Sequence, residues 1–195
     1  MNDPRQIRTR AALREALLDL LEDEGVEHVS VSALTRRAGV SRPTFYAHFE
    51  DVGSVLFEEL DTLLTEEEEA FRAAVEGLYG AAAGHALRPV LTALTHRIGR
   101  QERMFRSVLS GRAGAAARDR VWRHQVTVNR YYLDTQPHHA LPDHELELVA
   151  SFCAGGILDL HLRWLQGDLP VPAERVAELE MQMVGGALYM AVPRS

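Results

Sequence analysis

The sequence lacks several features that would place it in common classes of protein. It contains one cysteine, Cys153, which excludes an intramolecular disulfide and a cysteine-rich metal site. It has no run of eighteen apolar residues, so we expect no membrane span. The first residues, MNDPRQIRTR, show no apolar segment of a secretory signal. No glycine-rich phosphate loop, nucleophile elbow or paired-carboxylate motif is present. We therefore expect a cytoplasmic protein that is not an enzyme and needs no cofactor or metal.

Lysine is also absent, because all 21 basic residues are arginine, and the net charge is −7. An acidic chain is an unusual partner for nucleic acid, but the distribution of charge matters more than its sum. Residues 1–14 carry four arginines and one acid, residues 28–49 carry three arginines and no acid, and the acids of residues 15–27 lie between them. Such local basic patches suit phosphate binding, and we expect both to face one surface.

What the sequence does contain is a compact pair of predicted helices at residues 30–49, SVSALTRRAGVSRPTFYAHF. Gly39 can end the first helix in the left-handed conformation, and Ser41 suits the N-cap of the second. Pro43 falls in the first turn, where its missing N–H costs nothing. Phe45 and Phe49 are four residues apart and share an inward face. The residues left facing outward are Arg42, Thr44, Tyr46, Ala47 and His48. A helix pair that exposes this polar set suits the DNA major groove better than a protein core.

The second helix offers candidates for base readout. Arg42 can donate two hydrogen bonds to one guanine, a contact worth about 1–3 kcal/mol of discrimination. Pro43 and Thr44 can meet a thymine methyl group, and Ala47 allows the helix to lie close to the groove. Arg36 and Arg37 on the first helix are either phosphate contacts or surface residues that serve solubility.

These residues resemble the DNA-binding domain of the TetR (tetracycline repressor) family of bacterial regulators. The resemblance covers about the first fifty residues, and it rests on Thr9-Arg10, Leu13, Ala16, Leu20-Leu21, Gly25, Ser30-Val31, Leu34, Arg37 to Ser41, Thr44 to Tyr46 and His48-Phe49. It implies that phosphates are contacted by Tyr46 and His48 and, at helix N-termini, by Thr9 and Ser30 or Ser32. Val52 departs from the family, which often has a phosphate-binding lysine there, and Thr35 replaces a common alanine.

The rest of the chain also reads as helical, so we expect an all-α protein. A DNA-binding domain of three helices should occupy residues 1–50, and a larger helical domain for effector binding and dimerisation should occupy residues 51–195. Predicted helices cover residues 52 to past 71, with a break near Thr65, then 88–98, 101–109, 115–135, 143–166 and 173–191. Loops are expected at 77–84, 111–114, 136–142 and 167–172. The eight acids of residues 51–69 are expected to form a solvated helix face.

The last two predicted helices are apolar around much of their circumference and contain small residues at Ala154-Gly155-Gly156 and Gly185. Helices this apolar must pack against something. The stretch from Phe152 to Ile157 and the later Arg163-Trp164-Leu165 resemble the C-terminal part of one TetR subgroup. In the family, the last two helices of each subunit form a four-helix dimer interface. The alternative is that these helices close the core of a single subunit.

The family resemblance further implies a small-molecule pocket in the second domain. The candidate pocket residues are Phe105, Trp122, Tyr131, Phe152, His161 and Trp164, with His96 and Asp159 as weaker candidates. From the sequence alone, aromatics of this kind are more often core residues than pocket residues. The predicted function is thus a transcriptional regulator, with repression as the family default, that binds a palindromic double-stranded operator as a homodimer and is released by a small-molecule effector.

Two other classes of function stay open at this point. A helical adaptor would bind proteins through its acidic surface and would not bind DNA in a salt-sensitive way. An enzyme hidden in the C-terminal helices would depend on His161 or Cys153. A metal site at His138, His139, His144 and Glu145 matches no zinc spacing, and we expect these histidines to be polar surface.

Overall fold

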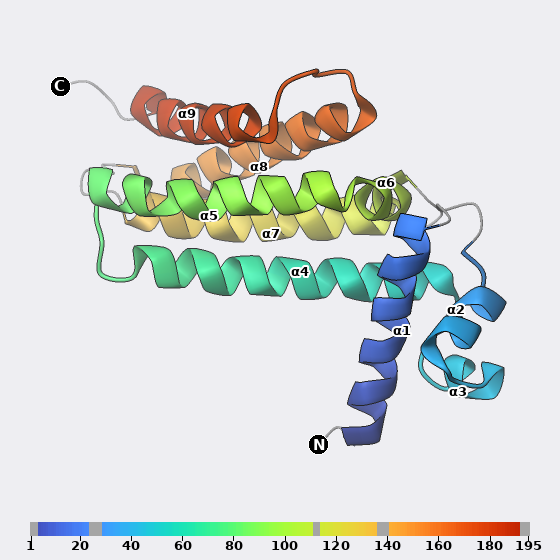
Figure 1. Cartoon of the computed structure of the whole chain (residues 1–195). Helices are drawn as coiled ribbons and strands as arrows, with labels where there is room; N and C mark the ends of the chain where they lie inside the picture. Colours follow the sequence, from blue (N-terminus) through green and yellow to red (C-terminus); the bar gives the residue numbers. More distant parts are fainter. Residues whose placement is uncertain (1–3, 24–28, 111–113, 136–140, 192–195) are drawn as a thin grey trace. The chain divides into compact units, whose positions relative to one another are not determined.

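The structure is a computed structural model that describes residues 4–23, 29–110, 114–135 and 141–191 (Figure 1). Every regular element in these ranges is an α-helix, which confirms the all-α prediction. The chain divides into two compact units. The first comprises residues 1–62 and 101–117, and the second comprises residues 63–100 and 118–195. Two helices, α4 (Val52–Val75) and α7 (Gly114–Asp134), have residues in both units.

The first unit is built around α1 (Pro4–Asp23), α2 (Val31–Ala38) and α3 (Arg42–Tyr46), together with the first part of α4 and α6 (Glu102–Ser110). Helix α1 contacts both α2 and α6, and α2 contacts α3. The helical spacing of apolar residues in α1 buries one face completely, because leucines recur every three or four residues. The buried side chains of this unit include Leu13, Leu17, Leu20, Leu34, Phe45, Val55, Leu60 and Met104.

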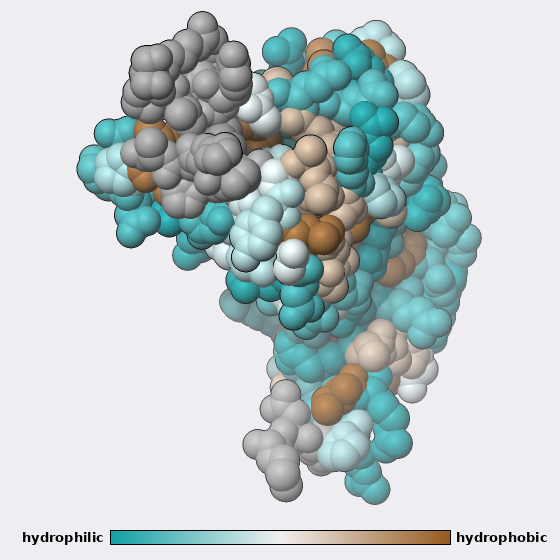
Figure 2. Space-filling view, turned by 90° about the vertical axis from the view of Figure 1, so that its left-hand side faces the viewer, coloured by the Kyte–Doolittle hydropathy of each residue, from teal (hydrophilic) through white to brown (hydrophobic). Residues whose placement is uncertain are grey.

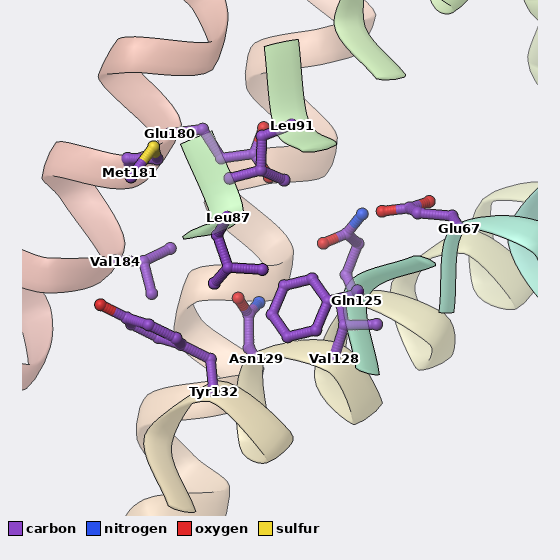
Figure 3. A pocket seen from close by; sticks show the side chains of 11 residues that line it. Glu67, Leu87, Leu91, Gln125, Val128, Asn129, Tyr132, Glu180, Met181 and Val184 are labelled. Carbon is purple, nitrogen blue, oxygen red and sulfur yellow. The ribbon is translucent and has the colours of Figure 1, made fainter. Parts of the chain in front are cut away.

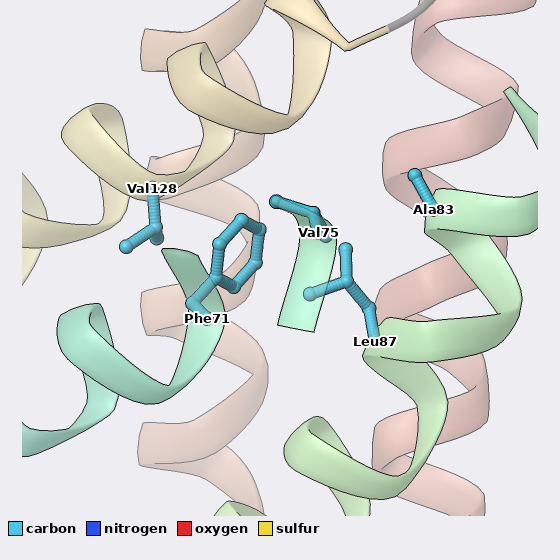
Figure 4. Packing of buried hydrophobic residues seen from close by; sticks show 5 residues of the cluster. All are labelled: Phe71, Val75, Ala83, Leu87 and Val128. Carbon is cyan, nitrogen blue, oxygen red and sulfur yellow. The ribbon is translucent and has the colours of Figure 1, made fainter. Parts of the chain in front are cut away.

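The second unit contains the remainder of α4 and α7 with α5 (Ala81–Arg100), α8 (Asp143–Gln166) and α9 (Ala173–Ala191). Helix α9 contacts both α5 and α8. A cluster of buried side chains from α4, α5 and α7 fills the space between these helices, as Figure 4 shows. Its members are Phe71, Val75, Ala83, Leu87 and Val128. A second cluster joins α8 to α9 through Cys153, Ile157 and Val184.

Most predicted helices lie where the sequence places them. Helices α8 and α9 have the predicted bounds, and α6 and α7 differ from theirs by one residue at each described end. Gly25 and most of the loops predicted at 111–114 and 136–142 lie outside the described residues. The predicted boundary between domains at residue 50 stays a prediction.

Two details of the sequence interpretation were wrong. Helix α4 does not break at Thr65, because its buried residues continue through Leu63, Leu64, Glu67 and Phe71 on one face. Helix α5 begins at Ala81 rather than at residue 88. The alanines that looked like a loose connection are strong helix formers, and Ala83 and Leu87 bury the same face.

Helix α8 is, within the described part of the chain, the one helix long and apolar enough to cross a membrane by length and composition alone. A helix that packs inside a bundle passes the same test, and α8 contacts α9 and carries exposed Asp159 and Arg163. Figure 2 shows one face of the protein, on which hydrophobic residues form short stretches between hydrophilic ones.

Candidate nucleic-acid interface

The turn between α2 and α3 has the geometry that the sequence predicts. Gly39 adopts φ 66° and ψ 28°, the left-handed conformation that glycine tolerates best. Ser41 is the N-cap of α3, and its hydroxyl accepts a hydrogen bond of 3.1 Å from the backbone N–H of Thr44. Pro43 lies in the first turn of α3. These local interactions fix where α3 begins and therefore which side chains face outward.

The candidate base-reading residues are accessible. Arg42, Pro43, Tyr46 and Ala47 are exposed. Thr44 and His48 are half-buried, and the Thr44 hydroxyl lies 2.7 Å from that of Ser41. The outward side chains of α3 are thus accessible to a partner as large as a DNA duplex, whereas a helix in a protein core would bury them.

Two phenylalanines anchor α3 from the inside, as their spacing predicts. Phe45 is fully buried, Phe49 is nearly so, and their ring centroids lie 6.0 Å apart. Arg10 of α1 closes this end of the motif. Its guanidinium lies 4.5 Å from the centroid of the Phe49 ring and donates a hydrogen bond of 3.1 Å to the carbonyl of His48. The same guanidinium pairs with Glu58 of α4.

These contacts correct the reading of the basic patches. Three of the seven arginines form ion pairs inside the first unit rather than standing ready for phosphate: Arg10 with Glu58, Arg14 with Glu59, and Arg37 with Asp19 and Asp23. The Arg14–Glu59 pair, at 2.6 Å, involves a carboxylate that is almost fully buried. The number of arginines in a segment therefore does not by itself tell how many of them are available to bind DNA. Arg8, Arg36 and Arg42 are exposed.

The acids of residues 51–69 are corrected in the same way. The sequence suggests a solvated face, but Glu58 and Glu59 hold α1 and Glu67 is buried in the second unit. The sequence gives no sign of these pairs, because the partners are far apart along the chain. Arg10 and Glu58 are 48 residues apart, and Arg14 and Glu59 are 45 residues apart. The fold brings them together.

The predicted phosphate contacts occupy different kinds of position. Ser30 is the N-cap of α2, and its hydroxyl accepts from the N–H of Ala33 at 3.2 Å. Ser32 is exposed in the first turn of that helix. Thr9 lies in the second turn of α1 rather than at its N-terminus, and its hydroxyl donates to the carbonyl of Arg5 at 3.0 Å. Thr35 is buried and donates to the carbonyl of Val31 at 2.8 Å, so the departure from alanine leaves no unpaired hydroxyl.

The second unit contains a small, partly open cavity between α4, α5, α7 and α9 (Figure 3). Its free volume is about 30 Å³. The apolar part of the wall is formed by Phe71, Leu87, Leu91, Val128 and Val184, and the polar part by Glu67, Gln125, Asn129 and Glu180. Tyr132 and Met181, which are half-exposed, complete it.

Burial perturbs the ionisable groups around this cavity. Desolvation, with a contribution from nearby Glu67, raises the pKa of Glu180 to about 8. Burial lowers the pKa of His161, although a hydrogen bond between its Nδ1 and the carbonyl of Ile157, at 3.0 Å, acts in the opposite direction. The His161 Nε2 and Glu180 Oε2 atoms lie 3.9 Å apart, and neither has a hydrogen-bond partner among the described residues.

None of the six predicted pocket residues lines this cavity. Phe105 is buried in the first unit, and Phe152 is 77% exposed on α8. Tyr131 packs edge-on against Phe71, with ring centroids 6.4 Å apart. Trp122 is half-buried on α7. Buried His161 lies close to Trp164, whose indole N–H donates to the carbonyl of Val171 at 2.9 Å. The sequence does not single out the polar lining residues Glu67, Gln125, Asn129 and Glu180 as pocket residues, because their burial becomes evident only in the fold.

The weaker candidates are placed elsewhere. His96 lies 2.9 Å from Glu174, and Asp159 is exposed. Burial raises the pKa of the Cys153 thiol, which makes it a poor nucleophile. Of the predicted histidine cluster, His138 and His139 lie outside the described residues. Within those residues, no group of three or more histidine, cysteine, aspartate or glutamate side chains could hold a metal ion.

Comparisons with known proteins agree with this geometry. Residues 13–52 match the family model described as bacterial regulatory proteins, tetR family. The HTH-type transcriptional regulator EthR of Mycolicibacterium smegmatis is 37% identical over 68 residues, which are 35% of this chain and 31% of that protein. EthR of Mycobacterium tuberculosis is 38% identical over 58 residues, 30% of this chain and 27% of that protein. The matches therefore span about a third of these curated relatives.

Solved structures share the fold over nearly the whole chain. Thermus thermophilus FadR, a TetR-family transcriptional repressor in complex with lauroyl-CoA, superposes with a TM-score of 0.70 at 17% identity, covering 95% of this chain and 97% of that one. A tetR-family transcriptional regulator from Streptomyces coelicolor gives a TM-score of 0.63 at 24% identity, covering 91% and 80%. Residues 13–52 thus match the helix-turn-helix segment of the tetR family of bacterial regulatory proteins, and the solved structures share the all-helical fold of the rest of the chain.

Proposed function

We propose that this protein is a cytoplasmic transcriptional regulator that binds a palindromic operator in double-stranded DNA as a homodimer, represses transcription and is released by a small-molecule effector. The observation that carries the proposal is the capped helix α3, which buries Phe45 and Phe49 while Arg42, Tyr46 and Ala47 stay exposed. A helix held in this way can enter the major groove with its outward residues against base edges.

In this proposal, base and phosphate contacts come from different residues. Arg42, at the start of α3, reads guanine, and Pro43 and Thr44 meet the adjacent base. Tyr46, His48, Ser32, Ser30 and Thr9 lie against the phosphates, although the hydroxyl groups of Ser30 and Thr9 also serve their own helices. Arg10 supports DNA binding indirectly, because its contacts with the His48 carbonyl and the Phe49 ring hold the end of the helix-turn-helix in place.

Dimerisation is supported by the exposed faces of α8 and α9. Leu148 and Phe152 are large apolar side chains that are 67% and 77% exposed, and Met183 of α9 is 46% exposed. A Cβ atom built on Gly155 or Gly156 meets nothing within 4 Å. Small residues beside exposed apolar ones allow the backbones of two helices to approach closely. A second copy of α8 and α9 would cover this surface and present two α3 helices to the two halves of an inverted repeat.

Effector release is supported by the continuity of α4. In its first half Glu58 and Glu59 bind arginines of α1, and in its second half Glu67 lines the cavity. A ligand that binds one conformation of these helices better than another shifts the population between them, and with it the affinity for DNA. The lauroyl-CoA in Thermus thermophilus FadR is an example of a ligand held by a similar fold.

Selection of binding sites from random duplex DNA tests the proposal. We expect an inverted repeat, and Arg42→Ala should relax the preference at one base pair per half-site while costing about 1–3 kcal/mol at that position. Arg36→Ala is a matched control, because Arg36 is an exposed arginine of α2 and its loss should weaken all sequences alike. Selection of unrelated, asymmetric sequences would contradict the dimer, and uniform weakening by Arg42→Ala would make Arg42 a phosphate contact.

A helical protein-binding adaptor is the alternative reading, and the same experiment separates it. An adaptor retains no duplex after selection at any salt concentration. No observation in the structure favours it over DNA binding.

A further inference from the structure

The small cavity of the second unit combines polar atoms that lack hydrogen-bond partners with two acidic side chains. Its lining includes two carboxylate side chains, Glu67 from α4 and Glu180 from α9, and contains no arginine. Both are more than 90% buried. Buried carboxyl groups are costly unless a hydrogen-bond donor or a positive charge accompanies them.

The buried polar atoms that lack hydrogen-bond partners indicate which chemical groups a ligand must bring. Glu180 Oε2 is buried with no hydrogen-bond partner, and the same holds for His161 Nε2, 3.9 Å away, and for Asn129 Nδ2 in the wall of the cavity. Because the His161 Nδ1 faces the carbonyl of Ile157, the neutral ring carries its proton there and Nε2 is an acceptor. His161 Nε2 and the ionised form of the Glu180 carboxyl are acceptors, which a ligand with N–H donors complements, whereas Asn129 Nδ2 is a donor.

The size and walls of the cavity narrow the ligand further. A free volume of about 30 Å³ accommodates a group about the size of one or two waters. A primary ammonium group is of this size and has three donors. Phe71 and Tyr132 place aromatic rings in the wall, which attract a cation through their faces. Met181 and Tyr132 are the half-exposed members of the lining, so an apolar substituent can lie against them.

We propose that this cavity binds a primary organic amine in its protonated form, with the ammonium group between the carboxylates of Glu67 and Glu180 and the apolar substituent against Met181 and Tyr132. Its role as the effector rests on the proposed function; its binding does not. The acidic lining disfavours an anionic ligand such as a carboxylate, since no arginine of the wall would neutralise it.

Binding of the amine is linked to the ionisation of Glu180. In the protein without ligand, Glu180 is mostly protonated at neutral pH, because its pKa is about 8. A bound cation stabilises the ionised carboxylate instead. The ionisable groups that face Glu180 are Glu67 from α4 and His161 from α8, while α5 contributes apolar Leu87 and Leu91 to the cavity. His124 of α7 lies behind Glu67, with its Nε2 3.0 Å from the Glu67 carboxylate. Complex formation at pH 7 should therefore release a proton.

Isothermal titration calorimetry of the full-length protein, without DNA, tests the inference with three matched probes: benzylamine, benzyl alcohol and benzoate. We expect saturable binding of benzylamine only, with proton release seen as a heat that depends on the ionisation enthalpy of the buffer. Glu180→Gln should weaken benzylamine at least tenfold. Glu178→Gln, which changes a half-exposed residue of the same helix that pairs with Arg175 and does not line the cavity, should leave binding unchanged.

Two outcomes of the titration overturn the inference. If no probe binds, the cavity holds water alone. If benzyl alcohol binds as well as benzylamine, the charge of the ligand does not matter. If Glu180→Gln does not fold as judged by circular dichroism, Glu67→Gln provides the same test from α4. Benzylamine binding without duplex binding would refute only the proposed function, and duplex binding without benzylamine binding would refute only the amine site.

Discussion

The buried Glu180 carboxyl should make the stability of this protein fall as pH rises through neutrality. Desolvation favours the neutral acid and raises the pKa of Glu180 from its ordinary value of 4.5 to about 8. Between these two values the folded protein holds a proton that the unfolded chain has lost. The free energy of unfolding therefore decreases as pH increases across this window, and it is highest, for this group, below the unfolded pKa.

The size of the effect follows from the same two pKa values. A difference between 4.5 and about 8, at about 1.4 kcal/mol per pH unit, limits the loss to about 5 kcal/mol by pH 8. Glu180→Gln keeps the shape and hydrogen-bonding capacity of the neutral acid but cannot ionise. We expect the variant to match the natural protein near pH 5 and to exceed its stability increasingly towards pH 8, in urea unfolding followed by circular dichroism.

His161 also makes stability depend on pH, but in the acidic range, and its effect must be distinguished from that of Glu180. Burial lowers the pKa of His161, so its contribution to stability is present above its unfolded pKa and is lost as pH falls. Comparison of Glu180→Gln with the natural protein cancels this term, because both contain His161. A difference in stability that is constant from pH 5 to pH 8 would refute the reasoning, since it would mean that Glu180 is as easily ionised in the folded state as in the unfolded chain.

Three further predictions concern stability and assembly. Phe45→Ala should remove a fully buried side chain and cost about 3–5 kcal/mol, as measured by urea unfolding, and a cost below 1 kcal/mol would contradict the role of Phe45 as the anchor of α3. Ser41→Ala should cost about 1 kcal/mol through loss of the N-cap bond, whereas the neighbouring Ser32→Ala should cost less because its side chain is exposed. Phe152→Glu should convert a dimer to a monomer in sedimentation velocity, with unchanged circular dichroism, because Phe152 is exposed on α8 in the single subunit; a variant that stays dimeric would place the interface elsewhere.

The sequence predicts the helix-turn-helix in detail because its determinants are local. The left-handed Gly39, the Ser41 cap and the spacing of Phe45 and Phe49 each act within four residues. The bounds of α8 and α9 are likewise set by nearby residues, with Pro142 before α8 and Gly167 after it. Local chemistry of this kind can be recognised without knowledge of the tertiary structure.

The interactions that join distant segments could not be predicted in this way. Arg10 looks like a candidate for phosphate until the fold brings Glu58 and the His48 carbonyl to it. Glu67 looks like one member of a solvated acidic run until α5, α7 and α9 close over it. In both cases the partner lies tens of residues away, so residue type and spacing alone give no signal of the pairing.

The salt dependence of duplex binding tests the central claim most directly. The affinity for the selected inverted repeat and for a scrambled duplex would be measured by fluorescence anisotropy between 50 and 200 mM salt. We predict tight binding to the repeat that weakens steeply with salt, by about 10³-fold or more if the dimer contacts at least six phosphates. No affinity for either duplex at the lowest salt concentration would contradict the assignment of α3 as a DNA-reading helix.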